Sequence, residues 1–83
     1  MKLTDDLLKL LGKTYEPSAV LNIKFRGNDV SFKTDANGNP VLLFIGKRNE
    51  QGNITGERFL RTLKYDQHGA IIKDHWDLKG KAS

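Results

Sequence analysis

The sequence predicts an α+β fold, in which a short N-terminal helix precedes a five-stranded antiparallel β-meander, built as a twisted sheet or a partly rolled barrel. Two observations carry this prediction. A leucine-rich segment with helix-capping residues precedes the first proline. After it, three segments at 35–38, 49–52 and 66–69 each place an Asp or Asn three positions before a glycine. Such segments form type I turns closed by a glycine in the left-handed conformation, and they connect antiparallel strands.

The helix is expected within residues 1–14. Thr4 suits the N-cap, the two aspartates that follow it favour the positive end of the helix dipole, and Gly12 can end the helix. Residues 15–19 form a linker whose proline blocks further helix. A helix of about two turns is unstable alone, so its leucines must dock on the sheet or on another chain.

The turn segments divide the rest of the chain into alternating apolar and polar runs, which are typical of strands. We expect strands at 20–26, 29–35, 41–48, 54–65 and 71–78. They form a meander over 20–79, followed by a tail at 80–83. A chain of 83 residues makes one domain, so 1–83 is read as a single unit.

Turn geometry also predicts the strand register. A first loop at 27–28 and the three later turns place Phe32 opposite Leu42, Leu42 opposite Leu60, and Leu60 opposite Trp76 in the principal core. This register gathers most of the large apolar residues on one face of the sheet. The predicted core face comprises Leu21, Ile23, Phe25, Val30, Phe32, Leu42, Phe44, Ile54, Leu60, Ile72, Trp76 and Leu78.

The opposite face of the predicted sheet is mostly charged but holds an apolar island in its middle. The expected interface on this island is Val41, Leu43, Ile45, Phe59, Leu63 and Tyr65. An exposed meander strand should alternate in polarity, so something must cover the island: the helix, a second copy of the protein, or a ligand. We expect the helix to lie on the Trp76 face and a homodimer to bury the island.

Composition restricts the class of protein. The chain has no cysteine, a net charge of +4, and no apolar run long enough to cross a bilayer. The N-terminus carries two aspartates where a signal peptide would be apolar. We expect a cytoplasmic protein with no membrane partner, and the positive charge admits an acidic partner, nucleic acid included.

No residue pattern indicates catalysis. Asp35, Asn37 and Asn39 alternate as in a calcium loop, but the required glycine and glutamate are missing from their places. The two histidines, His68 and His75, fall in a turn and a strand, and neither has a positioned partner for general-base work. We therefore expect no enzyme, no cofactor and no metal site.

Two functional hypotheses remain open. In the first, the protein is a non-catalytic binding module that contacts a protein partner or a second copy of itself through the apolar island. In the second, it binds single-stranded nucleic acid through basic side chains, with Phe59 and Tyr65 stacking on bases. The expected nucleic-acid contacts are Lys24, Lys33, Lys47, Arg61 and Lys73.

Overall fold

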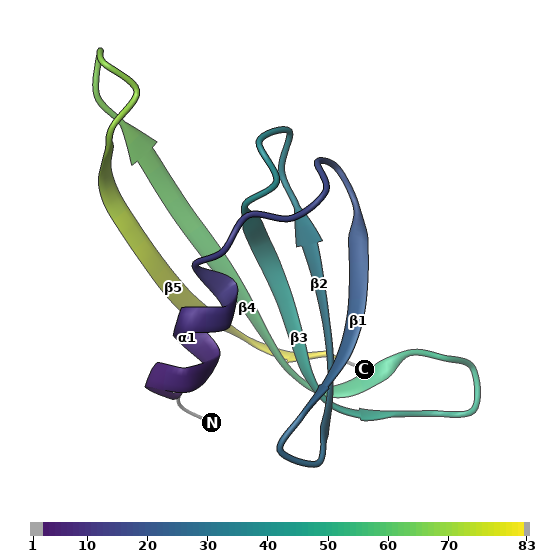
Figure 1. The fold of residues 1–83 in the computed structure, drawn as a ribbon. Coiled ribbons are helices and arrows are strands. Elements are labelled where there is room, and N and C mark those ends of the chain that lie inside the picture. The colour runs from purple at the N-terminus through teal and green to yellow at the C-terminus, as the bar shows by residue number, and fades with distance from the viewer. Residues whose placement is uncertain (1–2, 83) are drawn as a thin grey trace.

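The computed structural model describes residues 3–82, and it confirms the α+β fold (Figure 1). One helix is followed by five antiparallel strands that pair in sequence order into a single sheet. The sheet does not close into a barrel: β1 and β5 are its two edges. The elements are α1 (Asp5–Leu11), β1 (Val20–Phe25), β2 (Asn28–Thr34), β3 (Pro40–Arg48), β4 (Ile54–Tyr65) and β5 (Ile71–Ala82).

The helix and the last strand differ most from the sequence prediction, and the other strand ends differ by at most one residue. The helix occupies seven residues, Asp5–Leu11, with Thr4 as its N-cap, and residues 1–2 of the predicted helical segment lie outside the described residues. The predicted tail is wrong at 80–82, because β5 continues through Ala82, and residue 83 lies outside the described residues. No helix within residues 3–82 is long and apolar enough to cross a membrane.

The three Asx–glycine turns form as predicted. Gly38, Gly52 and Gly69 have φ angles of 84°, 86° and 84°. In the first of these turns, the Asp35 N–H donates to the Asn39 carbonyl at 2.9 Å, and the other two turns repeat the pattern. These turns hold their hairpins closed because the glycine adopts a conformation that side-chain-bearing residues avoid.

The predicted register is wrong in three of the four hairpins. In two of them the cause is a β-bulge beyond the turn. Between β2 and β3 the register shifts between Lys33 and Thr34, so Val41 has no partner and Phe32 pairs with Leu43. A matching shift beside Tyr65 leaves Ile72 unpaired in β5. Between β3 and β4 there is no shift, and Leu42 does pair with Leu60. A one-residue shift exchanges the two faces of a strand.

The first hairpin also differs in its loop. Arg26 and Gly27 form the two-residue turn, both with positive φ, so Ile23 pairs with Val30. The pairing of β1 with β2 is therefore displaced by two residues from the predicted pairing. Because side chains alternate with a period of two, the same residues of β1 still face the core. Further along the sheet, Gly46 and Gly56 face each other as expected. A Cβ atom on either glycine would lie 2.1 Å from a carbonyl oxygen of the opposite strand.

The core lies between α1 and one face of the sheet, and the helix covers the residues that were assigned to the apolar island. Leu7 and Leu11 pack on Leu43 and Phe59, so the expectation that a dimer covers these two residues is wrong. Trp76 is half-buried on this same face. The core cluster is Leu7, Leu11, Val30, Phe32, Leu43, Ile45 and Phe59.

The sheet surface opposite α1 is called the open face here. Leu42, Phe44 and Leu60, which were predicted to be in the core, lie on it, and Leu60 is 41% exposed. By register and alternation, the open face carries Asn22, Lys24, Asp29, Ser31, Lys33, Leu42, Phe44, Arg58, Leu60, Thr62, Lys64, Lys73, His75 and Asp77.

The linker is tied to the sheet at Thr34. The Thr34 hydroxyl donates to the Glu16 carbonyl at 2.6 Å and accepts from the Ala19 N–H at 2.8 Å. The Tyr15 ring packs against Phe32 in a tilted arrangement, with 5.0 Å between the ring centroids. These contacts attach the segment that follows α1 to β2.

Candidate functional site

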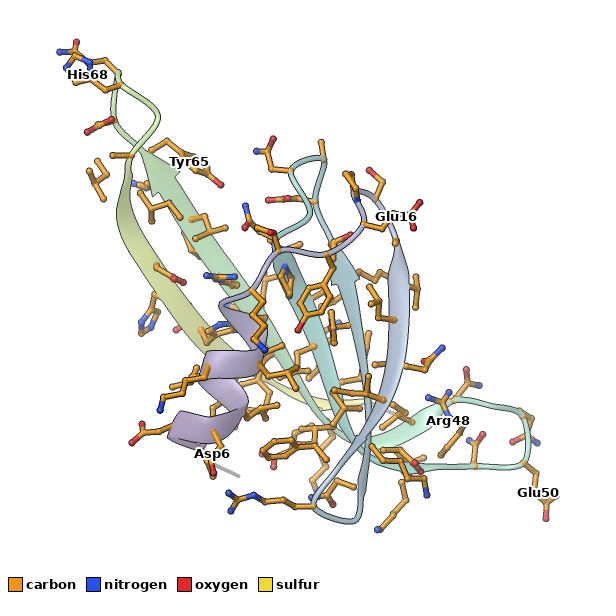
Figure 2. All side chains as sticks on the ribbon, in the orientation of Figure 1. Asp6, Glu16, Arg48, Glu50, Tyr65 and His68 are labelled. Atoms are coloured by element: carbon orange, nitrogen blue, oxygen red, sulfur yellow. The ribbon has the colours of Figure 1, made fainter. Side chains whose placement is uncertain are left out.

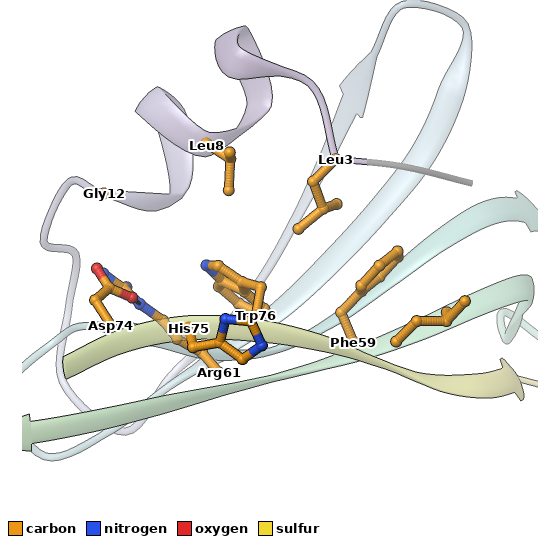
Figure 3. Close-up of a pocket in the computed structure, with 9 residues that line it drawn as sticks. Leu3, Leu8, Gly12, Phe59, Arg61, Asp74, His75 and Trp76 are labelled. Atoms are coloured by element: carbon orange, nitrogen blue, oxygen red, sulfur yellow. Dashed lines mark hydrogen bonds and ion pairs between the residues drawn. The ribbon is translucent and has the colours of Figure 1, made fainter.

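A groove of about 590 Å³ lies between α1 and the β4–β5 hairpin. Figure 3 shows Leu3 and Leu8 above it, with Trp76 and Phe59 below. Leu78 extends the apolar lining along β5. The groove therefore offers an apolar surface beside an edge strand.

Arg61 closes one end of the groove with an ion pair. Its Nε and Nη2 atoms donate to the two carboxylate oxygens of Asp74, each at 2.7 Å. Nη1 donates to the carbonyls of Leu11 and Pro40, both at 3.1 Å. The guanidinium carbon lies 5.7 Å from the centre of the Trp76 ring. One buried side chain thus joins the end of α1, the start of β3, and β5.

The charges of this pair are well matched. The Arg61 side chain is 5% exposed, and its donors face the carboxyl end of α1, where the helix dipole favours a cation. Hydrogen bonding from Arg61 lowers the pKa of Asp74 below its ordinary value, while burial opposes this effect. The carboxylate is therefore charged at neutral pH, and the pair is a structural contact rather than an acid–base dyad.

The free edge of β5 adjoins the groove. One side of this twelve-residue strand pairs with β4, and no other strand of residues 3–82 pairs with its second side. β5 has bulges at Ile72 and at Lys79, opposite the Arg58–Phe59 step of β4. Between these bulges, Lys73–Leu78 runs in regular register. In Figure 1, α1 lies in front of the middle of β5.

Exposed apolar side chains gather on the same hairpin. Seven large hydrophobic residues are exposed within the described part of the chain, and five of them belong to β4 and β5. Figure 2 shows Tyr65 on the part of this hairpin that projects beyond the other strands. The seven are Leu8, Val20, Leu60, Tyr65, Ile71, Ile72 and Leu78.

The open face carries a surplus of positive charge. Its two acids already have partners, since Asp29 lies 3.5 Å from the Lys24 ammonium and Asp77 lies 2.7 Å from a His75 ring nitrogen. A hydrogen bond from the Arg48 N–H lowers the pKa of Asp29 below its ordinary value. Four further cations of this face are exposed. They are Lys33, Arg58, Lys64 and Lys73.

The residues of the predicted interface do not form one surface. Leu43, Ile45 and Phe59 are buried beneath α1, which excludes them from an exposed interface in this structure. Val41 and Leu63 are half-buried, and Tyr65 is 41% exposed.

The predicted nucleic-acid contacts are also divided. Lys24, Lys33 and Lys73 share the open face. Lys47 lies on the other side by alternation and contacts the Gly27 carbonyl, and Arg61 is buried. The sequence prediction missed Arg58 and Lys64 of the open face, and only the correct register would have found them.

No group of three potential metal ligands occurs among the described residues. His68 lies at the tip of the β4–β5 hairpin, and His75 lies within β5, beside the groove. Comparison with protein-family models, with known proteins and with solved structures finds no match for this chain. The structure offers two candidate sites: the groove with the β5 edge, and the open face.

Proposed function

We propose that the protein is a non-catalytic binding module that associates with a second copy of itself through β5. One observation carries this proposal: a twelve-residue strand has an unpaired edge, and three of the seven exposed large hydrophobic residues of the described chain, Ile71, Ile72 and Leu78, lie on this strand. An open edge presents unpaired N–H and C=O groups, which a strand from another chain can satisfy.

The two sheet edges differ in a way that favours β5. β1 has six residues and follows a proline-containing linker, whereas β5 has twelve residues and no proline. Natural proteins protect edges with bulges and lysines, and β5 has both near its ends. The regular segment Lys73–Leu78 between the bulges carries one lysine and lies beside the apolar groove.

The strength of such an association follows from its size. A contact made by one strand edge and a shallow groove belongs to the small class of interfaces, below about 1,200 Å² in total. We therefore expect a dissociation constant in the micromolar range, about −8 kcal/mol.

Sedimentation equilibrium tests this proposal. The average mass of the wild-type protein should rise from the monomer towards the dimer as the concentration increases from about 1 µM to about 1 mM. Leu78→Lys places a charge beside the β5 edge and should hold the protein near the monomer mass. Val20→Lys is the matched control, because Val20 is 57% exposed and Leu78 is 50% exposed. A wild-type protein that stays monomeric throughout, or equal behaviour of the two variants, would contradict the proposal.

A second candidate function is the binding of single-stranded nucleic acid by the open face. Its support is the set of four exposed cations whose neighbouring acids are already paired, with Phe44 half-buried among them. Cations on an open sheet attract phosphates, and an aromatic ring can stack on a base.

Salt dependence distinguishes this second function. If four cations contact phosphates, the logarithm of the association constant for a labelled oligothymidylate should fall with the logarithm of salt concentration with a slope of about −3. Lys64→Ala should make the slope less steep by about 0.7. Lys13→Ala is the control, because Lys13 is an exposed cation between α1 and the linker, away from the open face. Absence of binding at low salt, or equal slopes for both variants, would refute this function.

A further inference from the structure

The regular part of β5 is complementary to itself in one antiparallel register. We propose that two copies of the chain pair through Lys73–Leu78 with His75 of both copies at the two-fold axis, which joins the two sheets into one of ten strands. The inference rests on the proposed self-association and adds to it the register and the contacts at the interface.

Symmetry restricts the possible registers. In a two-fold antiparallel pair, residues i and j lie opposite each other when i + j is constant. Two facing residues either both point their N–H and C=O groups towards the partner strand or both point them away, and the two kinds of pair alternate along the strands. Facing residues must therefore be separated by an even number of positions, so that i + j is even. The two-fold axis then passes between two copies of the same residue. The bulges at Ile72 and Lys79 leave His75 and Trp76 as the two central positions.

Charge decides between these two centres. With His75 on the axis, Lys73 lies opposite Asp77 of the second copy, and this ion pair forms twice. With Trp76 on the axis, Lys73 lies opposite Lys79, and two pairs of like charges form. Opposite charges on facing strand residues stabilise a sheet and like charges destabilise it, so the His75-centred register is favoured.

Apolar side chains support the same register. It brings the exposed Ile72, at the bulge just outside the regular segment, near Leu78 of the second copy, and this contact forms twice. These side chains are 66% and 50% exposed in the monomer. Trp76 lies opposite Asp74 of the second copy, on the side of the sheet that carries the groove.

The absence of cysteine from the chain makes the register directly testable. His75→Cys introduces a single thiol that would face its own copy across the axis. Facing residues in antiparallel strands have Cα atoms about 4.5–5.5 Å apart, within the range that a disulfide spans. Thr62→Cys is the matched control, because Thr62 pairs with His75 on the same face but lies on an inner strand.

Under mild oxidation, His75→Cys should form a disulfide-linked dimer at least about ten times faster than Thr62→Cys, because pairing raises the effective concentration of facing thiols. An equal mixture of Lys73→Cys and Asp77→Cys should give well over twice as much mixed dimer as either homodimer, as measured by intact mass spectrometry, because random pairing alone gives a twofold excess. Circular dichroism establishes that each variant is folded, and the mixture provides a second test if the substitution of His75 disturbs the strand.

The outcomes separate the register from the self-association. If sedimentation shows a dimer but the mixture of His75→Cys with Asp77→Cys links faster than His75→Cys alone, the axis lies at Trp76 and the proposed register is overturned. A dimer that gives no preferential cross-link at any of these positions overturns pairing through β5. A protein that remains monomeric and cross-links no faster than the Thr62→Cys control refutes both proposals.

Discussion

The ion pair between Arg61 and Asp74 offers a quantitative test of the packing of α1 on the sheet. Asp74→Ala leaves a guanidinium that is 5% exposed without acceptors for Nε and Nη2. Removing one partner of a buried pair costs about 3–5 kcal/mol. The lower value applies here, because Nη1 keeps its two carbonyl partners and the Asp74 side chain is 43% exposed. We therefore expect a loss of about 3 kcal/mol, or about 12 °C or more in Tm for a domain of this size.

Urea unfolding followed by the fluorescence of Trp76, the only tryptophan, measures this loss. The double variant Arg61→Met with Asp74→Leu removes both charges and should recover most of the stability, because an apolar pair avoids the buried charge. A loss below about 1 kcal/mol for Asp74→Ala would refute the reasoning and place Arg61 in contact with water. A double variant as unstable as the single one would show that the hydrogen bonds to the two carbonyls matter more than the charge pair.

Three further predictions concern local contacts. Gly38 and Gly69 both have positive φ, so Gly69→Ala should cost roughly 1–2 kcal/mol of stability. Gly38→Ala should cost more, because a Cβ at Gly38 would lie 2.2 Å from the Tyr15 carbonyl oxygen, whereas a Cβ at Gly69 would meet no atom within 4 Å. Equal losses in urea unfolding would contradict this prediction. Thr34→Val should cost about 1–3 kcal/mol in the same assay, since it leaves the linker groups unsatisfied, and an unchanged midpoint would be the opposing result. The pKa of Asp74 is lower in the folded state than its ordinary value of 3.8, so the Asp74 carboxylate stabilises the fold above pH 3.8 and this stabilisation is lost as the pH falls below that value. Asp74→Asn should therefore flatten the acid limb of a stability–pH curve. Parallel curves for the variant and the wild type would refute the assignment.

The order of the elements could be predicted from sequence because it depends on local chemistry. Thr4 caps the helix, and the Asx–glycine turns close three hairpins at the predicted glycines. The first loop was misplaced by one residue because Arg26, which is not a glycine, adopts positive φ. Such a conformation is uncommon for a residue with a Cβ atom, so no simple turn rule predicts it.

The faces of β3 and β4 could not be predicted because the bulge at Val41 has no distinct local signal. The run of five apolar residues at 41–45 buries an apolar set in either register, namely Leu42 with Phe44 or Leu43 with Ile45. Hydrophobic alternation therefore did not select between them. The predicted register also placed Arg61 and Asp74 on opposite faces of the sheet. Their ion pair and the burial of Arg61 could therefore not be predicted from the sequence.

Amide hydrogen exchange along the two sheet edges tests the central claim, that the free edge of β5 is the binding surface. Alternate amides of Lys73–Leu78 should exchange slowly at high protein concentration and faster on dilution, because pairing with a second strand protects them. Amides on the outer edge of β1 should exchange at the same rate at every concentration. Equal and concentration-independent exchange at the two edges would contradict the claim.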